Sequence, residues 1–197
     1  MKLVFPVILG YVLGSVPIGF LVAHYWGHID IRHYGSGNIG TTNVFRTLGF
    51  YPGSIVLIGD IGKGVIAVLL GKWLGGEQAA LLAGLAAILG HSWSIFLSFK
   101  GGRGVATGAG VFLALTPKVI LIAALIWILV IAITGYVSLG SIIAAGSLPI
   151  LMLIFRESSI LLFFACIAVF FVIYRHRPNI KRLLEGTEHK FRIKPMK

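Results

Sequence analysis

The chain has 197 residues, of which 57% are hydrophobic and only 12% are charged, and its formal net charge at pH 7 is +11. Soluble domains carry about a quarter charged residues, so this composition excludes a soluble globular protein and indicates a membrane protein. The apolar stretches are continuous and do not alternate with polar residues, which favours transmembrane helices over a transmembrane β-barrel.

Seven predominantly apolar stretches follow one another, and most approach the roughly 20 residues that a helix needs to cross a bilayer. We therefore predict an all-α, polytopic helical bundle of about seven spans, with five or six as the alternative, forming a single domain over residues 1–197. Only Lys2 precedes the first stretch and no A-x-A site follows it, so we expect a retained helix and not a signal peptide. The predicted spans are residues 3–23, 53–74, 79–97, 104–116, 118–134, 139–155 and 158–174.

Small and helix-breaking residues inside these spans carry local predictions. Gly10 and Gly14 have the GxxxG spacing that lets helices pack closely in lipid. Pro17 lies inside the first span and predicts a kink or local unwinding there.

Lysine and arginine are distributed unevenly over the predicted loops. With seven spans and the N-terminus outside, the loop 25–52, the loop near residue 100 and the tail from residue 175 share one side with most of the cations. The positive-inside rule makes that side cytoplasmic, so we predict a multi-pass protein of the cell inner membrane with a cytoplasmic C-terminus. Alternatively, these cations serve only orientation and contact with anionic lipids.

The first polar stretch, GSGNIGTTNVFR at residues 35–46, has the composition of an anion site. It matches G-x-G-x-x-G, but it lacks the preceding strand and βαβ unit that a dinucleotide fold requires. Its glycines still allow backbone N–H groups to converge on an anion, and Arg46 supplies a planar cation suited to phosphate. The alternative is a polar turn that merely links two spans. The candidate binding residues beside Arg46 are Ser36, Gly37, Asn38, Gly40, Thr41, Thr42 and Asn43.

The second polar stretch, FKGGRGVAT at residues 99–107, repeats this composition. Lys100 and Arg103 flank a Gly-Gly pair, and an apolar helix is predicted to begin near Gly104, which would point a helix N-terminus at a bound anion. The alternative is a flexible cationic turn, and the spacing of a Walker loop is absent. The candidate binding residues are Lys100, Gly101, Gly102, Arg103, Gly104 and Thr107.

A few titratable residues lie inside or beside the spans. Asp60 and Lys63 are one helical turn apart in an apolar stretch, where charges either neutralise each other or line a functional cavity. His91 precedes the end of a span and is expected at the membrane interface. The three histidines of residues 24–33 are four and five residues apart across a helix-to-loop junction, without a convincing acidic or cysteine partner, and the chain has one cysteine, so no metal and no cofactor is predicted.

Two familiar acyl-transfer signatures are missing, since no His is followed five residues later by Asp and no G-x-S-x-G occurs. Instead, GSGNIGTTNVFRTLG, HSWSIFLSFKGGRGVATGAG and RHRPNIKRLLEGTE resemble the three cytoplasmic motifs of the bacterial PlsY-type acylphosphate:glycerol-3-phosphate acyltransferases. The resemblance runs essentially end to end. It implies an integral-membrane enzyme of phospholipid biosynthesis that moves a fatty acyl group from acyl-phosphate to the sn-1 hydroxyl of glycerol 3-phosphate, giving lysophosphatidic acid and phosphate.

The resemblance also implies roles for individual residues. It makes the second motif a loop for the phosphate of glycerol 3-phosphate, and it gives Glu185 a structural role. Arg103 stands where family members often have Lys, so proton transfer from this position is not expected. The implied catalytic residues are Ser36, Arg46, His176 and Asn179.

The expected partners are glycerol 3-phosphate, long-chain acyl-phosphate and membrane lipids, with no nucleic acid, and the enzyme that makes acyl-phosphate is a candidate for functional coupling. One alternative function is a small transporter of anions, which predicts polar groups across both halves of the bilayer and internal repeats. Another is a non-enzymatic lipid-binding scaffold, which explains the basic tail but not the glycine loops.

Overall fold

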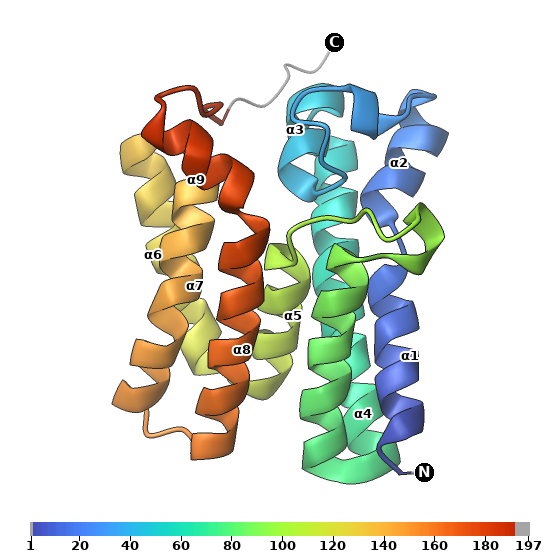
Figure 1. Ribbon diagram of the computed structural model, residues 1–197, viewed down its shortest axis with the longest axis vertical. Coiled ribbons are helices and arrows are strands. Elements are labelled where there is room, and N and C mark those ends of the chain that lie inside the picture. Colours follow the sequence, from blue (N-terminus) through green and yellow to red (C-terminus); the bar gives the residue numbers. More distant parts are fainter. Residues whose placement is uncertain (1, 192–197) are drawn as a thin grey trace. The chain divides into compact units, whose positions relative to one another are not determined.

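The computed structural model describes residues 2–191, and every regular element there is helical, which confirms the predicted all-α class (Figure 1). The cytoplasmic location predicted for the C-terminus concerns a chain end that lies outside the described residues. Two compact units divide the chain between Val111 and Phe112. The first contains α1 (Val4–Ser15), α2 (Ile18–Gly27), η1 (Ile31–His33), α3 (Thr41–Leu48), α4 (Phe50–Ser92), η2 (Ile95–Leu97) and the start of α5 (Val105–Leu115). The second contains the end of α5, then α6 (Pro117–Thr134), α7 (Val137–Ile154), α8 (Ser159–Arg175) and α9 (Arg177–Leu184).

Helix α4 consists of two helices that meet at Gly76. The φ of 76° and ψ of −164° at Gly76 form a conformation that residues with a side chain rarely adopt. The two halves run antiparallel, because a Cβ on Gly71 would lie 2.9 Å from the Cα of Ala80 and because Asp60 reaches His91. Two separate spans were predicted on either side of this turn, and the fold confirms that separation.

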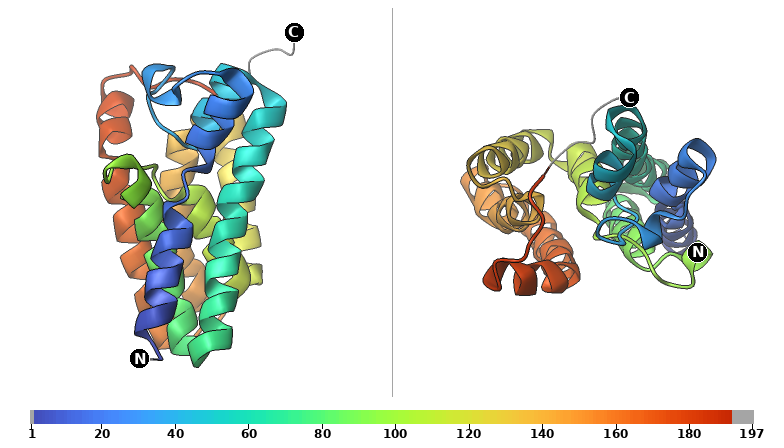
Figure 2. Two further views of the ribbon diagram at one scale, coloured as in Figure 1. Left: turned by 90° about the vertical axis from the view of Figure 1, so that its right-hand side faces the viewer. Right: turned by 90° about the horizontal axis from the view of Figure 1, so that it is seen from above.

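Helix α1 lies along α4, as the left view of Figure 2 shows. A Cβ on Gly10 would lie 2.9 Å from the Cα of Ala83, and one on Gly14 would lie 2.5 Å from the Cα of Ala87. These glycines therefore let the two backbones approach closely, which confirms the packing predicted from their spacing. The helix ends before Pro17 and α2 begins after it, so the predicted break at this proline is also confirmed.

In the second unit, α6 and α7 form a hairpin whose turn contains Gly135, with a φ of 77°. The indole N–H of Trp127 on α6 donates to Ser141 Oγ on α7 at 3.2 Å. Helix α8 packs on α7 and then bends by 57° into the short helix α9. His176 lies at this bend, so the third polar motif begins where an apolar helix ends.

Four helical segments among the described residues are long and apolar enough to cross a membrane, and the bent pair α8–α9 makes a fifth. This count takes Phe50–Leu97 as one segment, although α4 turns back at Gly76. Helix α5 has only 11 residues, about 16 Å of helix against a hydrocarbon core of about 30 Å. The length and hydropathy of these helices suit a membrane-spanning protein, whereas the number of seven spans stays a prediction.

Candidate active site

The first polar stretch folds around one buried side chain, that of Asn43. Its Nδ2 donates to the carbonyl oxygens of Tyr34 and Asn38, each at 2.9 Å, and its Oδ1 accepts the backbone N–H of Ser36 at 2.9 Å. Only 1% of Asn43 is exposed. Because both ends of its amide bond to the loop backbone, Asn43 sets the shape of the loop.

The remaining residues of this loop lead into α3. Gly37 has a φ of 69°, which favours glycine, and Asn38 Oδ1 accepts the N–H of Gly40 at 2.7 Å, immediately before the helix begins. Thr41 Oγ1 is buried and makes no hydrogen bond within the described part of the chain. The half-buried residues, which a substrate could reach, are Ser36, Asn38, Thr42 and Arg46.

The second polar stretch forms the loop between α4 and α5. The N–H of Gly102 donates to the carbonyl of His91 at 3.0 Å, and a Cβ on Gly102 would lie 2.9 Å from Cε1 of the same imidazole. Gly104 has a φ of 81° and turns the chain into α5, which starts at Val105 as predicted. The first N–H groups of a helix have no partner inside it, so this end of α5 offers donors beside the loop.

The two loops are joined by one hydrophobic cluster in the first unit. Leu97 of the second loop is buried together with Ile31, Ile39 and Val44, which belong to or flank the first loop. Residues about 60 positions apart in the sequence therefore share one core. Leu97, two residues before the second polar stretch, thus ties that loop to the first one.

Not every cation near the first loop is available to an anion. Arg32 donates from Nε and Nη2 to the carboxylate of Asp30 at 2.7–3.1 Å. The hydrogen bonds from Arg32 lower the pKa of Asp30 to about 2, so this pair stays ionised at physiological pH. Arg32 is thus neutralised locally. The cations that remain candidates in the two loops are Arg46, Lys100 and Arg103.

The third motif builds a buried polar group in the second unit. His176 is 1% exposed, and its Nδ1 lies 2.7 Å from the carbonyl oxygen of Val172, to which it donates. Asn179, one helical turn further on, is 2% exposed and donates from Nδ2 to Glu188 Oε1 at 2.7 Å. Its Oδ1 makes no hydrogen bond within residues 2–191.

Sequence reasoning missed the importance of Glu188. This carboxylate accepts hydrogen bonds from Asn179, from Ser138 Oγ at 2.8 Å and from Arg182 Nε at 2.7 Å. Burial raises its pKa, but the three hydrogen bonds outweigh that effect and the net shift is downward. Glu185, which was expected to be structural, is exposed, and its Oε1 lies 3.8 Å from Lys181 Nζ.

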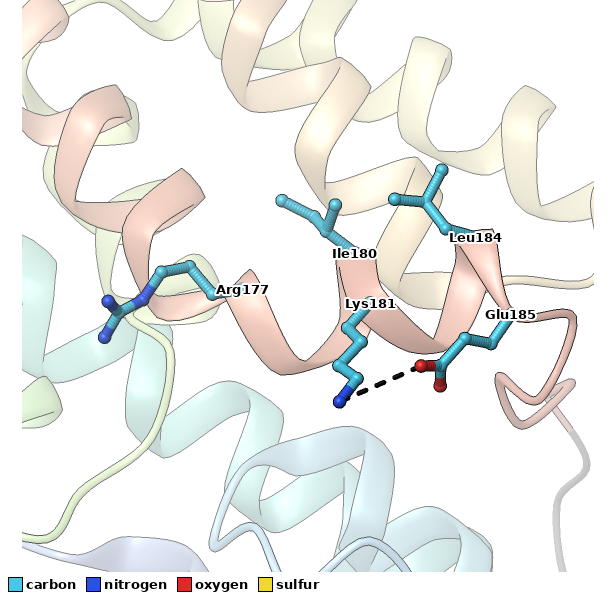
Figure 3. A pocket seen from close by; sticks show the side chains of 5 residues that line it. All are labelled: Arg177, Ile180, Lys181, Leu184 and Glu185. Carbon is cyan, nitrogen blue, oxygen red and sulfur yellow. Dashed lines mark ion pairs between the residues drawn. The ribbon is translucent and has the colours of Figure 1, made fainter.

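The outer side of α9 carries a shallow groove, shown in Figure 3. The buried His176 and Asn179 are not among the residues that line it. A short helix with one cationic and one apolar side suits the interface between a membrane and water. The lining residues are Arg177, Ile180, Lys181, Leu184 and Glu185.

A helical membrane protein that gathers glycines, hydroxyls and cations in its loops belongs to a class built for anionic substrates. A family model described as glycerol-3-phosphate acyltransferase matches residues 4–186. A glycerol-3-phosphate acyltransferase of Desulforamulus reducens is 51% identical over 181 residues, which cover 91% of this chain and 90% of that protein. A glycerol-3-phosphate acyltransferase 2 of Moorella thermoacetica is 52% identical over 183 residues, covering 93% and 94%.

Solved structures agree with these sequences. The crystal structure of PlsY, an integral membrane glycerol 3-phosphate acyltransferase in its glycerol 3-phosphate form, superposes with a TM-score of 0.92 at 41% identity, covering 98% of this chain and 96% of that one. The chain therefore belongs to the glycerol-3-phosphate acyltransferase family, a family of enzymes. This membership excludes the transporter and scaffold alternatives.

The surroundings of one histidine were not expected. His91, which was predicted at the membrane interface, is only 5% exposed and faces Asp60 inside the first unit. The pairing of Asp60 with Lys63 is confirmed, with Nζ 2.8 Å from Oδ1.

Proposed function

We propose that the chain transfers a fatty acyl group from acyl-phosphate to the sn-1 hydroxyl of glycerol 3-phosphate, releasing lysophosphatidic acid and phosphate. The observation that carries this proposal is the turn at Gly102, whose backbone lies against His91 with no room for a side chain. Lys100 and Arg103 flank the turn and the N-terminus of α5 follows it. Cations and a helix N-terminus together bind a phosphate ester well.

The chemistry asks little of a covalent nucleophile, since acyl-phosphate is a mixed anhydride. The sn-1 hydroxyl oxygen attacks the carbonyl carbon, the bond from this carbon to the phosphate oxygen breaks, and the hydroxyl proton passes to the leaving phosphate directly or through His176. Both substrates are anions, so the cationic loops offset their repulsion. Holding the hydroxyl at the carbonyl contributes about 7–11 kcal/mol to lowering such a barrier.

The third motif supplies two groups that can accept the proton or a hydrogen bond of the substrate hydroxyl. Because Nδ1 of His176 donates to a backbone carbonyl, the neutral ring carries its lone pair on Nε2, the form that accepts a proton. Asn179 is fixed by Glu188 through its Nδ2, and its Oδ1 is an acceptor for a substrate hydroxyl.

Burial separates direct contacts from supporting roles. Ser36, Arg46, Lys100 and Arg103 are half-buried or exposed and contact the two substrates. Asn43 and Thr107 are almost fully buried and hold the loop and the start of α5 in place. Glu188 does the same for the third motif, and Glu185 stabilises the end of α9. The other loop residues that complete the phosphate contacts are Gly37, Asn38, Gly40, Thr41, Thr42, Gly101, Gly102 and Gly104.

The protein crosses the cell inner membrane seven times, with the N-terminus outside and the active site facing the cytoplasm. The turn at Gly76 supports this count, because it makes α4 contribute two crossings. Charge supports the orientation, since the cation-rich loops lie on one side of such a topology. The two compact units act as one acyltransferase domain among membrane lipids, functionally coupled to the enzyme that supplies acyl-phosphate.

The donor is tested with purified protein and labelled glycerol 3-phosphate, comparing palmitoyl-phosphate with palmitoyl-CoA. We expect labelled lysophosphatidic acid from palmitoyl-phosphate alone, without added metal and unaffected by EDTA. Equal turnover with palmitoyl-CoA, or a loss of activity in EDTA that zinc or magnesium restores, would contradict the proposal.

A further inference from the structure

A charged group lies deep inside the first unit, away from the residues assigned to the substrates. Asp60, Lys63 and His91 are each at most 5% exposed. Lys63 Nζ lies 2.8 Å from Asp60 Oδ1, and His91 Nδ1 lies 3.5 Å from the same oxygen. Two nitrogens therefore lie within ion-pair distance of one carboxylate oxygen of Asp60.

The group is anchored to the break in the first span. Lys63 Nζ donates to the carbonyl oxygen of Val16 at 3.0 Å. Val16 precedes Pro17, which has no N–H, so the carbonyls at this break need donors from outside α1. The next residue after Lys63 is Gly64, and a Cβ there would lie 2.9 Å from the backbone nitrogen of Val111 in α5. The charged group thus stands between the end of α1 and the start of α5.

At its other end the group reaches the second glycine loop. The backbone of His91 accepts the N–H of Gly102 at 3.0 Å, and its imidazole fills the space that a Gly102 side chain would occupy, with Cδ2 3.0 Å from an added Cβ. Residues just after His91 are tied to α1 as well, since Ser94 Oγ donates to the carbonyl of Ser15 at 2.5 Å. A shift of the imidazole would therefore move the Gly102 backbone directly.

We infer that Asp60 and Lys63 hold the His91 imidazole as a template under Gly102, and that these three are positioning residues for the phosphate-binding loop. The inference rests on the proposed function only for the identity of the ligand. Asp60 holds the His91 imidazole in place, and Lys63 ties Asp60 to the carbonyl of Val16 at the break after α1. The imidazole in turn sets the position of the Gly102 backbone. All three side chains are at most 5% exposed, so we expect them to affect the affinity of the loop and not the acyl-transfer step.

The test compares the neutral pair Asp60→Asn/Lys63→Met with His91→Ala, Gly102→Ala and a control, Val68→Ala. The double substitution leaves no unpaired buried charge, so it folds where a single one would be costly. Val68 is 2% exposed on α4 and lies outside the network, so it reports on packing alone. KM is measured for glycerol 3-phosphate at saturating donor and for the donor at saturating glycerol 3-phosphate, together with Tm.

We expect the neutral pair and His91→Ala to raise the KM for glycerol 3-phosphate about three- to tenfold, the effect of one displaced hydrogen bond, with the donor KM within about twofold of wild type. Val68→Ala should lower Tm and move neither KM. If the neutral pair keeps both wild-type KM values, the charges only neutralise each other and the inference is overturned. If Gly102→Ala and the neutral pair both raise the donor KM instead, the positioning role holds and the assignment of this loop to glycerol 3-phosphate fails.

Discussion

Replacing Asn43 by Asp exchanges one NH2 group for an oxygen in the first glycine loop and changes the shape of the side chain hardly at all. In the native loop Nδ2 donates to the carbonyls of Tyr34 and Asn38 at 2.9 Å, while Oδ1 accepts from Ser36. An aspartate keeps the acceptor but loses both donors. Two carbonyl oxygens would then face a carboxylate oxygen at a site that is 1% exposed.

The cost follows from those two lost donors. A buried acceptor left without a partner costs about 1–3 kcal/mol, so the loss of both donors should lower the free energy of unfolding by about 2–6 kcal/mol. In a chain of this length each kcal/mol lowers Tm by about 2–4 °C, giving a loss of about 4–24 °C. Carboxylate protonation would restore one donor, so the loss should shrink at acid pH.

The matched control is Asn38→Asp in the same loop. Asn38 uses its Oδ1 to accept the N–H of Gly40 at 2.7 Å, and an aspartate retains that acceptor. Thermal unfolding of the purified variants should therefore show a large loss for Asn43→Asp and little change for Asn38→Asp. Equal Tm values for the two variants would refute the view that the Asn43 NH2 group builds the loop.

Three further predictions concern charge and topology. Arg46→Ala and Arg103→Ala should each lower kcat/KM by about one to two decades, because each variant loses one charge-assisted hydrogen bond. Lys118→Ala, on the opposite predicted side of the membrane, should leave kcat/KM unchanged. Equal effects of all three substitutions would mean that the cations set the topology and do not bind substrate. Cysteines introduced at 100–104 should be labelled only after membranes are opened, and labelling of intact cells would reverse the topology. Glu188 has a lowered pKa in the folded protein, so its stabilisation is present above its unfolded pKa of about 4.5 and is lost as pH falls below it. Tm should thus fall more steeply below about pH 5 in wild type than in Glu188→Gln, and parallel curves would contradict this assignment.

The helical part of the fold was predictable because a bilayer leaves few options. A run of apolar residues about 20 long has to be a helix, since its backbone groups find no partners in lipid. The turn at Gly76 falls in the gap between the predicted spans 53–74 and 79–97. The anion-site composition of the two loops was likewise visible, because the glycines and cations of each loop lie close together in the sequence.

The partners of single polar side chains were not predictable. Asn43 had the same composition signal as Asn38, yet Asn43 is buried as the organiser of its loop and Asn38 remains half-buried. His91 was placed at the interface from its position near a span end. Its burial depends on Asp60, 31 residues earlier, and this contact exists only because α4 folds back on itself.

The position of Glu188, three residues after Glu185, shows why helical counting fails beyond a turn. Glu185 caps the end of α9 and, four residues after Lys181, continues the exposed side of that helix. Gly186 then adopts a φ of 70°, and the N–H of Thr187 bonds back to the carbonyl of Arg182 at 2.8 Å. This reversal returns the chain toward α7 and brings Glu188 to Ser138, Asn179 and Arg182. A helical period carried past Gly186 would leave Glu188 outside, so the residue that holds the third motif together is found only once the left-handed turn is known.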